Sequence, residues 1–355
     1  PLPHRHAMIR WLRRDKAPLP HAVPNPARAA AADASPPSAE HVLRRLEWSV
    51  LKRLDGVLLG DYRTLMRGSG LDLADLREYQ MHDDVRHIDW NVTARMQTPH
   101  VRVFTEDREM AAWFLLDLSP SVDFGSGMLR KRQVSAEFVA VLARLLTRHG
   151  NRVGALLYGA GVEKMIPARA SRAHVLHLLH AMQQVQPSAT TNKRAGRAEQ
   201  TSAGDTKLSE LLLAAANAIH RRSTIFVVSD FISEPGWEKP LGQLALRHEV
   251  IAVRLTDPLE LELPDLGLLT LRDAETGEQL LVDTHNPTFR KRFAAIAAQR
   301  EADLRQSLAR AGVDTLELST DDDMAQAIVR FTELRRQRAR LAAGGGMPAH
   351  LRKTA

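Results

Sequence analysis

The stretch WFLLDLSPS, residues 113–121, decides the fold because it joins a fully apolar run to a polar turn. Four apolar residues in a row indicate a strand that is buried on both faces, which is typical of a parallel sheet covered by helices. Asp117, Ser119 and Ser121 then follow at spacings of two, so that one loop carries three small oxygen-bearing side chains. Such a loop either ends the strand through Asx and Ser turns or holds a metal ion.

Apolar strands alternate with helices through the rest of the chain. We expect further strands at 151–159, 161–168, 223–231, 249–257 and 313–318, and a small strand pair at 268–271 and 279–282. We expect helices at 130–150, 171–185, 207–222, 237–248, 287–311 and 321–341. This alternation predicts an α/β fold, a doubly wound and mostly parallel sheet with helices on both faces, plus a smaller strand-rich addition on the N-terminal side. In such sheets the ligand site lies beyond the carboxyl ends of the strands, where the strand order reverses.

Composition divides the chain into four parts. Residues 1–39 are rich in Pro and Ala without a sustained period, which predicts a disordered or loosely attached segment. Residues 40–109 form a charged N-terminal region, and residues 110–341 carry the α/β domain. Residues 342–355 look disordered. Within the α/β domain the polar loop 187–205 is long enough that we expect it to be functional or mobile.

The overall composition favours a soluble protein. The 355 residues are 44% hydrophobic, and no cysteine is present, which excludes disulfides and thiolate metal sites and fits a reducing compartment. No apolar run approaches the ~20 residues that cross a bilayer, and the N-terminal stretch lacks the apolar core of a signal peptide. We therefore expect a cytoplasmic location. The net charge of +7 raises nucleic acid or an anionic membrane as partners, but acidic residues are interspersed with the basic ones, and no nucleic-acid partner is expected.

Oxygen-bearing side chains recur at three strand or helix edges. Besides Asp117, Ser119 and Ser121, Thr206 stands just before a predicted helix and Asp230 follows the apolar strand TIFVVS. Carboxylate and hydroxyl oxygens are the ligands that Mg²⁺ and Mn²⁺ prefer, and Mg²⁺ usually takes one or two carboxylates from the protein. The five residues together predict a divalent-cation site. The alternative for each of them is an ordinary turn or helix cap.

The order D-L-S-P-S, then G-D-T, then V-S-D resembles the metal-ion-dependent adhesion site of von Willebrand factor A domains. The resemblance implies that Asp117, Ser119, Ser121, Thr206 and Asp230 hold the ion, and that one coordination position is left for an acidic side chain of a partner protein. The sequence departs from the wider family at one point, because Phe231 stands where a glycine often follows the last aspartate.

The segments LREYQMHDDVRHIDWNVTAR at 76–95 and DPLELELPDLGLLTLRDAETGEQLLVDT at 257–284 flank this pattern. In this order they resemble the bacterial family called domain of unknown function 58, over roughly residues 55–300. The resemblance implies a partner, an AAA+ ATPase of the MoxR type, and a role in the maturation or remodelling of other proteins.

The charged stretch 76–95 has two interpretations. In the one we favour, Arg77, Glu78, Asp83, Asp84, Arg86 and Asp89 form a salt-bridge lattice around Trp90 that docks this region on the sheet domain. In the other, Arg77, Arg86 and Arg95 form a surface that faces a partner or a phosphate group.

The sequence therefore predicts a non-enzymatic, metal-dependent protein-binding adaptor. Two alternatives stay open. One is a metal-dependent phosphotransfer or hydrolytic enzyme that uses Asp117, although neither a G-x-x-x-x-G-K-[ST] loop nor a G-x-S-x-G elbow occurs. The other is a basic binder of nucleic acid or of a membrane surface. A weaker metal candidate is the row His174, His177 and His180, which is better explained as a partly exposed helix face.

Overall fold

The structure is a computed structural model that describes residues 39–46, 50, 71–81, 83–106, 111–185, 206–272 and 279–342. The predictions for residues 1–38, for the loop 187–205 and for the tail from residue 343 lie outside these residues and stay predictions. Within the described part of the chain, every helix is too short or too polar to cross a lipid bilayer.

A six-stranded sheet with the order β10-β7-β6-β3-β4-β5 forms the centre of the molecule. Its strands are β3 (Ala111–Asp117), β4 (Arg152–Tyr158), β5 (Val162–Arg169), β6 (Thr224–Ser229), β7 (Glu249–Thr256) and β10 (Asp314–Ser319). All neighbours pair in parallel except β5, which runs antiparallel to β4 at one edge. Strands β3, β4, β6 and β7 are buried along nearly their whole length, as their apolar runs predict.

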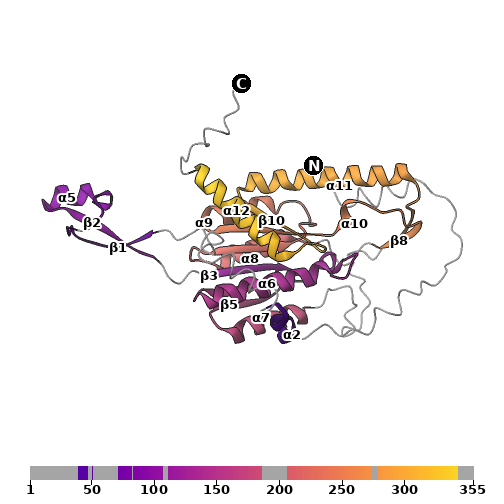
Figure 1. Ribbon diagram of the computed structural model, residues 1–355, viewed down its shortest axis with the longest axis horizontal. Coiled ribbons are helices and arrows are strands. Elements are labelled where there is room, and N and C mark those ends of the chain that lie inside the picture. Colours follow the sequence, from indigo (N-terminus) through magenta and orange to yellow (C-terminus); the bar gives the residue numbers. More distant parts are fainter. Residues whose placement is uncertain are drawn as a thin grey trace, which may run out of the picture.

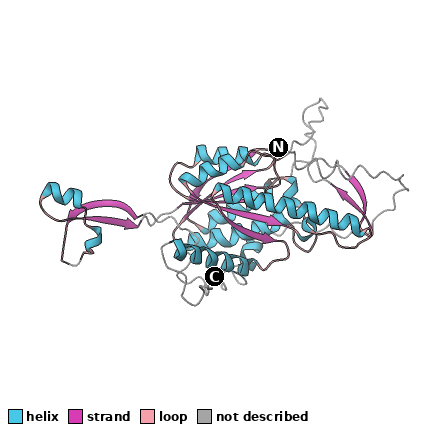
Figure 2. Ribbon diagram, turned by 90° about the horizontal axis from the view of Figure 1, so that it is seen from above, coloured by secondary structure: helices cyan, strands magenta, loops and turns pink. Residues whose placement is uncertain are grey.

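Helices cover both faces of this sheet (Figures 1 and 2). Helices α2 (Ala39–Leu46), α6 (Lys131–Arg148), α7 (Arg172–Gln184) and α12 (Met324–Ala342) share one hydrophobic core with the sheet, and α8 (Leu208–Ala218), α9 (Glu238–Arg247) and α11 (Pro287–Ala311) share a second. Alternate residues of β3 feed the two cores, with Phe114 in the first and Trp113 in the second. The predicted doubly wound, mostly parallel α/β fold is therefore confirmed.

A small hairpin unit precedes the sheet in the chain and stands off from it in Figures 1 and 2. It consists of β1 (Leu71–Glu78), the short 3-10 helix η3 (Val85–His87), α5 (Trp90–Met96) and β2 (His100–Glu106), and β1 pairs antiparallel with β2. The Arg77 guanidinium makes two hydrogen bonds to the Asp83 carboxylate, at 2.8 and 2.7 Å. The Asp89 carboxylate caps α5 by accepting from the backbone N–H groups of Asn91 and Val92.

The expected lattice around Trp90 is wrong in its main feature. The Trp90 side chain is 69% exposed, and Arg86 and Arg95 are exposed as well. Asp84 and Asp89 close a local turn and a helix cap instead, because an aspartate two or three residues before a backbone N–H accepts from it at little entropic cost. Only the Arg77–Asp83 pair of the expected lattice is present as an ion pair among the described residues.

The segment after β7 returns to the sheet through a short helix and the predicted strand pair. Helix α10 (Pro258–Leu261) is followed by β8 (Leu268–Arg272) and β9 (Gln279–Asp283), which pair antiparallel. Asp257 and Glu260 form a capping box at the start of α10, and Pro258 occupies its first turn. This box places Glu260 at the same edge of the sheet as the end of β6, where the candidate site residue Asp230 lies.

Candidate metal centre

Asp117 stands at the point where the strand order reverses, between β3 and β6. Its register partner on β4 is Tyr158, and β6 lies on its other side, since Leu116 pairs with Val228. The next residue of β6, Ser229, donates from its hydroxyl to Asp117 Oδ2 at 2.6 Å. Asp117 is therefore fixed at the carboxyl edge of the sheet, where doubly wound folds bind their ligands.

The loop after β3 holds its two serines inward. Ser119 donates its backbone N–H to Asp117 Oδ1 at 3.0 Å, which is the predicted Asx turn, and the Oγ atoms of Ser119 and Ser121 lie 3.1 Å apart. Ser119 precedes the short 3-10 helix η4 (Pro120–Asp123), but its side chain makes no capping hydrogen bond there. Both serines are nevertheless buried. Their hydroxyls therefore lie beside the Asp117 carboxylate, and the Ser119 side chain also contributes a hydrogen bond to it.

Thr206 and Asp230 come to the same edge. Asp230 directly follows β6 and is fully buried. Thr206 is also buried, and its carbonyl accepts from the Ser233 hydroxyl at 2.7 Å and from the Glu234 backbone N–H at 2.9 Å. These bonds hold Thr206 against the loop that follows Asp230. The five predicted site residues are thus gathered at one edge of the sheet, although their side chains are not equally available.

Phe231 stands where a glycine often follows the last aspartate of the resembled pattern, and its backbone adopts a conformation that glycine favours. Its φ of 54° lies in the left-handed region that glycine adopts most easily. The Ser229 hydroxyl accepts from the Phe231 backbone N–H at 2.9 Å, and the ring packs against Trp237 at 5.4 Å between centroids. These contacts offset the ~1 kcal/mol or more that this conformation costs an ordinary residue. The turn that aims Asp230 is therefore kept without glycine.

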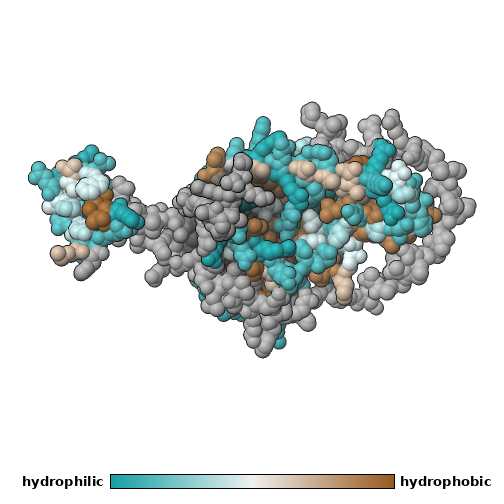
Figure 3. All heavy atoms as spheres, turned by 45° about the horizontal axis from the view of Figure 1, so that its top comes forward, coloured by the Kyte–Doolittle hydropathy of each residue, from teal (hydrophilic) through white to brown (hydrophobic). Residues whose placement is uncertain are grey.

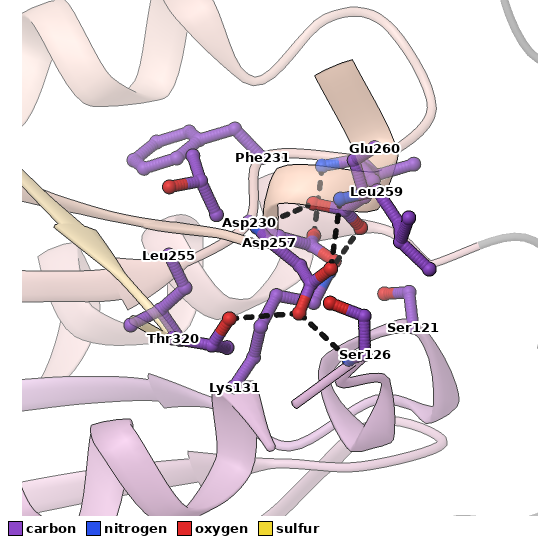
Figure 4. Close-up of polar contacts among 12 residues, drawn as sticks. Ser121, Ser126, Lys131, Asp230, Phe231, Leu255, Asp257, Leu259, Glu260 and Thr320 are labelled. Atoms are coloured by element: carbon purple, nitrogen blue, oxygen red, sulfur yellow. Dashed lines mark hydrogen bonds and ion pairs between the residues drawn. The ribbon is translucent and has the colours of Figure 1, made fainter. Parts of the chain in front are cut away.

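Lys131 is a residue of the candidate site that the sequence analysis did not identify. Its side chain is fully buried, and its ammonium lies 2.8 Å from Asp230 Oδ2 and 2.6 Å from Glu260 Oε1. In Figure 4, Lys131 reaches from the first turn of α6 toward these two carboxylates. The other oxygen of Asp230, Oδ1, accepts from the Ile232 backbone N–H at 2.9 Å. Both oxygens of Asp230 are therefore engaged, whereas Asp117 accepts only from neutral donors.

A third buried aspartate, Asp257, lies at the end of β7. Figure 4 shows it accepting from the Ser126 backbone N–H at 2.8 Å and from the Thr320 hydroxyl at 2.7 Å, and the Leu259 backbone N–H donates to its other oxygen. These donors hold the pKa of Asp257 below its ordinary value, although burial acts in the opposite direction. Asp257 is thus a fully satisfied cap that ties η4, α10 and β10 together.

The pKa values separate Asp117 from Asp230. Burial, and then the negative charge of Asp230, raise the pKa of Asp117 to about 6, and its hydrogen bonds from Ser229 and Ser119 only partly offset them. Burial would also raise the pKa of Asp230, but the charge and hydrogen bond of Lys131 lower it below the ordinary value. Among the residues that the structure describes, Asp117 has no cationic side chain in contact. It is a buried carboxylate that lacks a counter-ion.

The charges around Asp117 leave an excess of negative charge. Ion pairs, hydrogen bonds or close charge interactions connect four carboxylates with three cations: Asp117, Asp230, Glu260 and Glu301 with Lys131, Arg254 and Arg300. Four negative and three positive charges leave a net charge of one negative unit, which favours the binding of a cation beside Asp117. No group of three acidic or histidine side chains converges as a ready-made metal cage in the described residues. An ion here would depend on Asp117 together with hydroxyl groups, which is a donor set that suits Mg²⁺ or Mn²⁺.

The row of histidines on α7 is not a second centre. His174 is buried, and its Nε2 lies 2.8 Å from the Val153 carbonyl oxygen on β4, so that this histidine joins the helix to the sheet. Burial lowers the pKa of His174, which keeps the ring neutral near pH 7.

The fold and the site define a doubly wound α/β domain with a candidate cation site at its carboxyl edge. The chain belongs to the family described as "Protein of unknown function DUF58", whose pattern it matches over residues 75–303. It is 37% identical over 320 residues to uncharacterized proteins of Mycobacterium bovis and of Mycobacterium tuberculosis, covering 90% of this chain and 96% of each relative.

Solved structures of low identity resemble it too. The conserved hypothetical protein BatB of Bacteroides thetaiotaomicron has 13% identity and a TM-score of 0.39, covering 64% of this chain and 99% of that one. The VWA domain of SpRpn10 has 12% identity and a TM-score of 0.32, covering 62% of this chain and 94% of that one.

Proposed function

We propose that this protein is a non-enzymatic adaptor that binds Mg²⁺ or Mn²⁺ at Asp117 and, through the ion, an acidic side chain of a partner protein. The observation that carries the proposal is the buried Asp117 carboxylate, which has no cationic contact among the described residues and lies beside a cluster with one excess negative charge. A buried carboxylate in this state is costly, and a bound divalent cation removes the cost.

The residues of the chain have distinct parts in this proposal. Asp117, Ser119 and Ser121 would hold the ion directly, and Thr206 and Asp230 would stand around it as further or water-mediated ligands. The bound ion would supply an uncompensated positive charge that attracts one carboxylate from outside. The hydrogen bonds from Ser229 and the Ser119 backbone N–H orient the Asp117 carboxylate, so that little freedom is lost when the ion is captured.

The site favours binding over catalysis. A serine nucleophile needs a neighbouring base, but the Ser119 and Ser121 hydroxyls lie within hydrogen-bond distance of each other. Lys131, the nearest candidate for a general base or a phosphate ligand, is shared between two carboxylates, and their charges raise its pKa although burial opposes them. A protonated lysine held in this way does not accept a proton. The adaptor role is therefore proposed ahead of a phosphotransfer or hydrolytic enzyme.

The partner proposed for this adaptor is an AAA+ ATPase of the MoxR type, as the family resemblance implies. The hairpin unit offers a second contact surface, which we call the α5 surface and define as Met81, Val85, Arg86, Trp90 and Arg95. Met81, Val85 and Trp90 are 91%, 60% and 69% exposed, and Figure 3 shows an apolar area on this unit. Exposed tryptophan beside arginine is typical of protein-binding hot spots. Arg77 does not belong to this surface, because Asp83 binds it within the unit.

Titration of metal-stripped protein with Mn²⁺ and Mg²⁺ in a calorimeter tests the proposed ion site. We expect saturable binding of one ion per chain. The double change Ser119→Ala and Ser121→Ala is expected to weaken binding at least tenfold, because two oxygen ligands are lost. Ser135→Ala is the matched control, since Ser135 is a buried serine on α6 whose hydroxyl has no hydrogen-bond partner among the described residues. The proposed ion site would be refuted if the heat of Mn²⁺ binding were the same in the wild type, the double variant and the control, or if the wild type gave no binding heat.

The α5 surface is tested by a pull-down of a MoxR-type ATPase from the same organism, with Mn²⁺ present. We expect Trp90→Ala with Arg95→Glu to reduce capture at least tenfold and to leave the melting temperature within about one degree, because exposed side chains contribute little to stability. Leu246→Ala serves as the control, since Leu246 is 88% exposed on α9. Equal loss in this control, or no loss in the double variant, would remove the α5 surface from the proposed interface.

A further inference from the structure

Lys131 lies fully buried between two carboxylates that come from different segments of the chain. A fully buried ammonium loses its hydration, and two carboxylates compensate for that loss here. One of them, Asp230, is also a proposed ligand of the ion, whereas the other, Glu260, comes from α10 on a different segment. The ammonium therefore sits between the candidate metal centre and a second carboxylate that lies outside it (Figure 4).

We propose that Lys131 is a built-in competitor of the divalent ion, which holds Asp230 while the site is empty and moves its charge toward Glu260 when an ion binds. This inference rests on the proposed ion site and adds a residue that sets its affinity. The positive charge of Lys131 repels an incoming cation, and its hydrogen bond occupies Asp230 Oδ2. Both effects make the isolated site weak, so that a partner carboxylate is needed for tight closure.

Glu260 makes the exchange possible. Its Oε1 already lies 2.6 Å from Lys131, so the ammonium can release Asp230 without becoming an unpaired buried charge. Its Oε2 accepts the Asp257 backbone N–H at 3.2 Å within the capping box, which keeps Glu260 in place during the exchange. A lysine with a single carboxylate partner would have no such second position.

The buried ion pairs of Arg335 lack this relation to the site. Arg335 on α12 pairs with Asp314 at 2.7 Å and with Glu249, at the amino ends of β10 and β7. That cluster likewise has one buried cation between two carboxylates, although the exposed Arg338 also pairs with Asp314 at 3.1 Å, and it lies at the opposite edge of the sheet. It provides a matched control for the loss of a buried cation.

The first test is Lys131→Met, in which the side chain keeps its length and loses its charge. We expect Mn²⁺ to bind at least tenfold more tightly than in the wild type by calorimetry, because Asp230 is released and the repulsion is gone. Without metal the variant should melt at a lower temperature, and saturating Mn²⁺ should raise its melting temperature more than that of the wild type. Arg335→Met should also lower the melting temperature, but it should leave the Mn²⁺ affinity unchanged.

The second test is Glu260→Gln, which removes the alternative carboxylate and keeps an acceptor oxygen for the cap. Lys131 then has only Asp230 as a charged partner, so we expect Mn²⁺ to bind at least threefold more weakly. A purely structural lysine predicts that neither change alters the affinity, or that both weaken it together with stability. Only a competition between Lys131 and the ion predicts that Lys131→Met raises the Mn²⁺ affinity while Glu260→Gln lowers it. If Lys131→Met does not fold, the affinity of Glu260→Gln decides whether the competition exists.

The outcomes distinguish this inference from the proposed function. If the wild type binds Mn²⁺ and Lys131→Met binds it no more tightly, the competition is refuted and the ion site stands. If the wild type binds none and Lys131→Met binds one ion, the competition stands and the metal-dependent adaptor is refuted for the natural chain. If no variant binds, both are refuted.

Discussion

Asp117→Asn is expected to abolish Mn²⁺ and Mg²⁺ binding and, at the same time, to stabilise the metal-free protein at pH 7. Binding should weaken at least a hundredfold, because the substitution removes the charge of a fully buried carboxylate that has no cationic contact among the described residues and that is the central ligand of the proposed ion. The amide keeps the local hydrogen bonds. Its oxygen can accept from the Ser119 backbone N–H, and its NH₂ group can donate to the Ser229 hydroxyl.

The stabilisation follows from the raised pKa of Asp117. A carboxyl whose pKa is about 6 in the folded protein and 3.8 when unfolded binds its proton more tightly in the folded state. The metal-free protein therefore loses stability as the pH rises from 3.8 through 6, by an amount on the order of 2–3 kcal/mol that is complete above pH 6. Asparagine carries no charge and avoids this loss.

Melting curves at pH 4.5 and pH 7, with EDTA and with Mn²⁺, check the prediction. In EDTA the variant should melt above the wild type at pH 7, and this difference should shrink at pH 4.5, where Asp117 is protonated. In Mn²⁺ at pH 7 the order should reverse, because only the wild type gains binding energy. A variant that is less stable than the wild type in EDTA at pH 7 would show that Asp117 is a structural cap and not a vacant ligand.

The sheet and its helices were predictable because each central strand is apolar on both faces and each helix has an amphipathic period. The gathering of Asp117, Ser119, Ser121 and Asp230 was predictable for a related reason, whereas Thr206 follows no strand and is held at the same edge by Ser233 and Glu234. In a parallel sheet all carboxyl ends lie at one edge, so polar residues that follow successive strands must meet there.

The counter-charges of the site were harder to predict. A lysine in the first turn of a helix is usually solvated, so nothing marked Lys131 as buried. The pattern D-x-x-E after β7 does mark Asp257 and Glu260 as a capping box, but it does not show that Glu260 also faces Lys131. Arg254 left the clearest signal. It is a charged residue inside the apolar strand EVIAVRLT, which indicates a buried ion pair.

The charged stretch 76–95 was misjudged because sequence alone does not separate charges that pair from charges that close turns. Arg77 and Asp83 pair across a turn, whereas Asp84 and Asp89 accept from nearby backbone N–H groups. Such local acceptors lie two or three residues away and need no distant partner. The arginines expected to pair with them, Arg86 among others, are left exposed.

Arg254→Met is expected to destabilise the fold by about 3–5 kcal/mol, which is the usual cost of removing one partner of a buried ion pair. Arg254 is 3% exposed, and its guanidinium donates to the Glu301 carboxylate on α11 and to the backbone carbonyl of Asp230. Removal leaves Glu301, which is 9% exposed, without this cation, and it leaves the Asp230 carbonyl without its donor. Urea unfolding at pH 7 in EDTA measures the loss.

A double-mutant cycle with Glu301→Met separates the two consequences of losing Arg254. Two methionines replace the ion pair with apolar groups, so the double variant should recover at least half of the lost stability, as buried pairs exchanged for hydrophobic side chains often do. Mn²⁺ affinity should not recover with it, because the Asp230 carbonyl still lacks its donor and the turn that aims this aspartate is loosened. Stability effects that simply add would show that Arg254 and Glu301 do not interact. Affinity that returns together with stability would show that the Arg254 contact to Asp230 has no part in shaping the site.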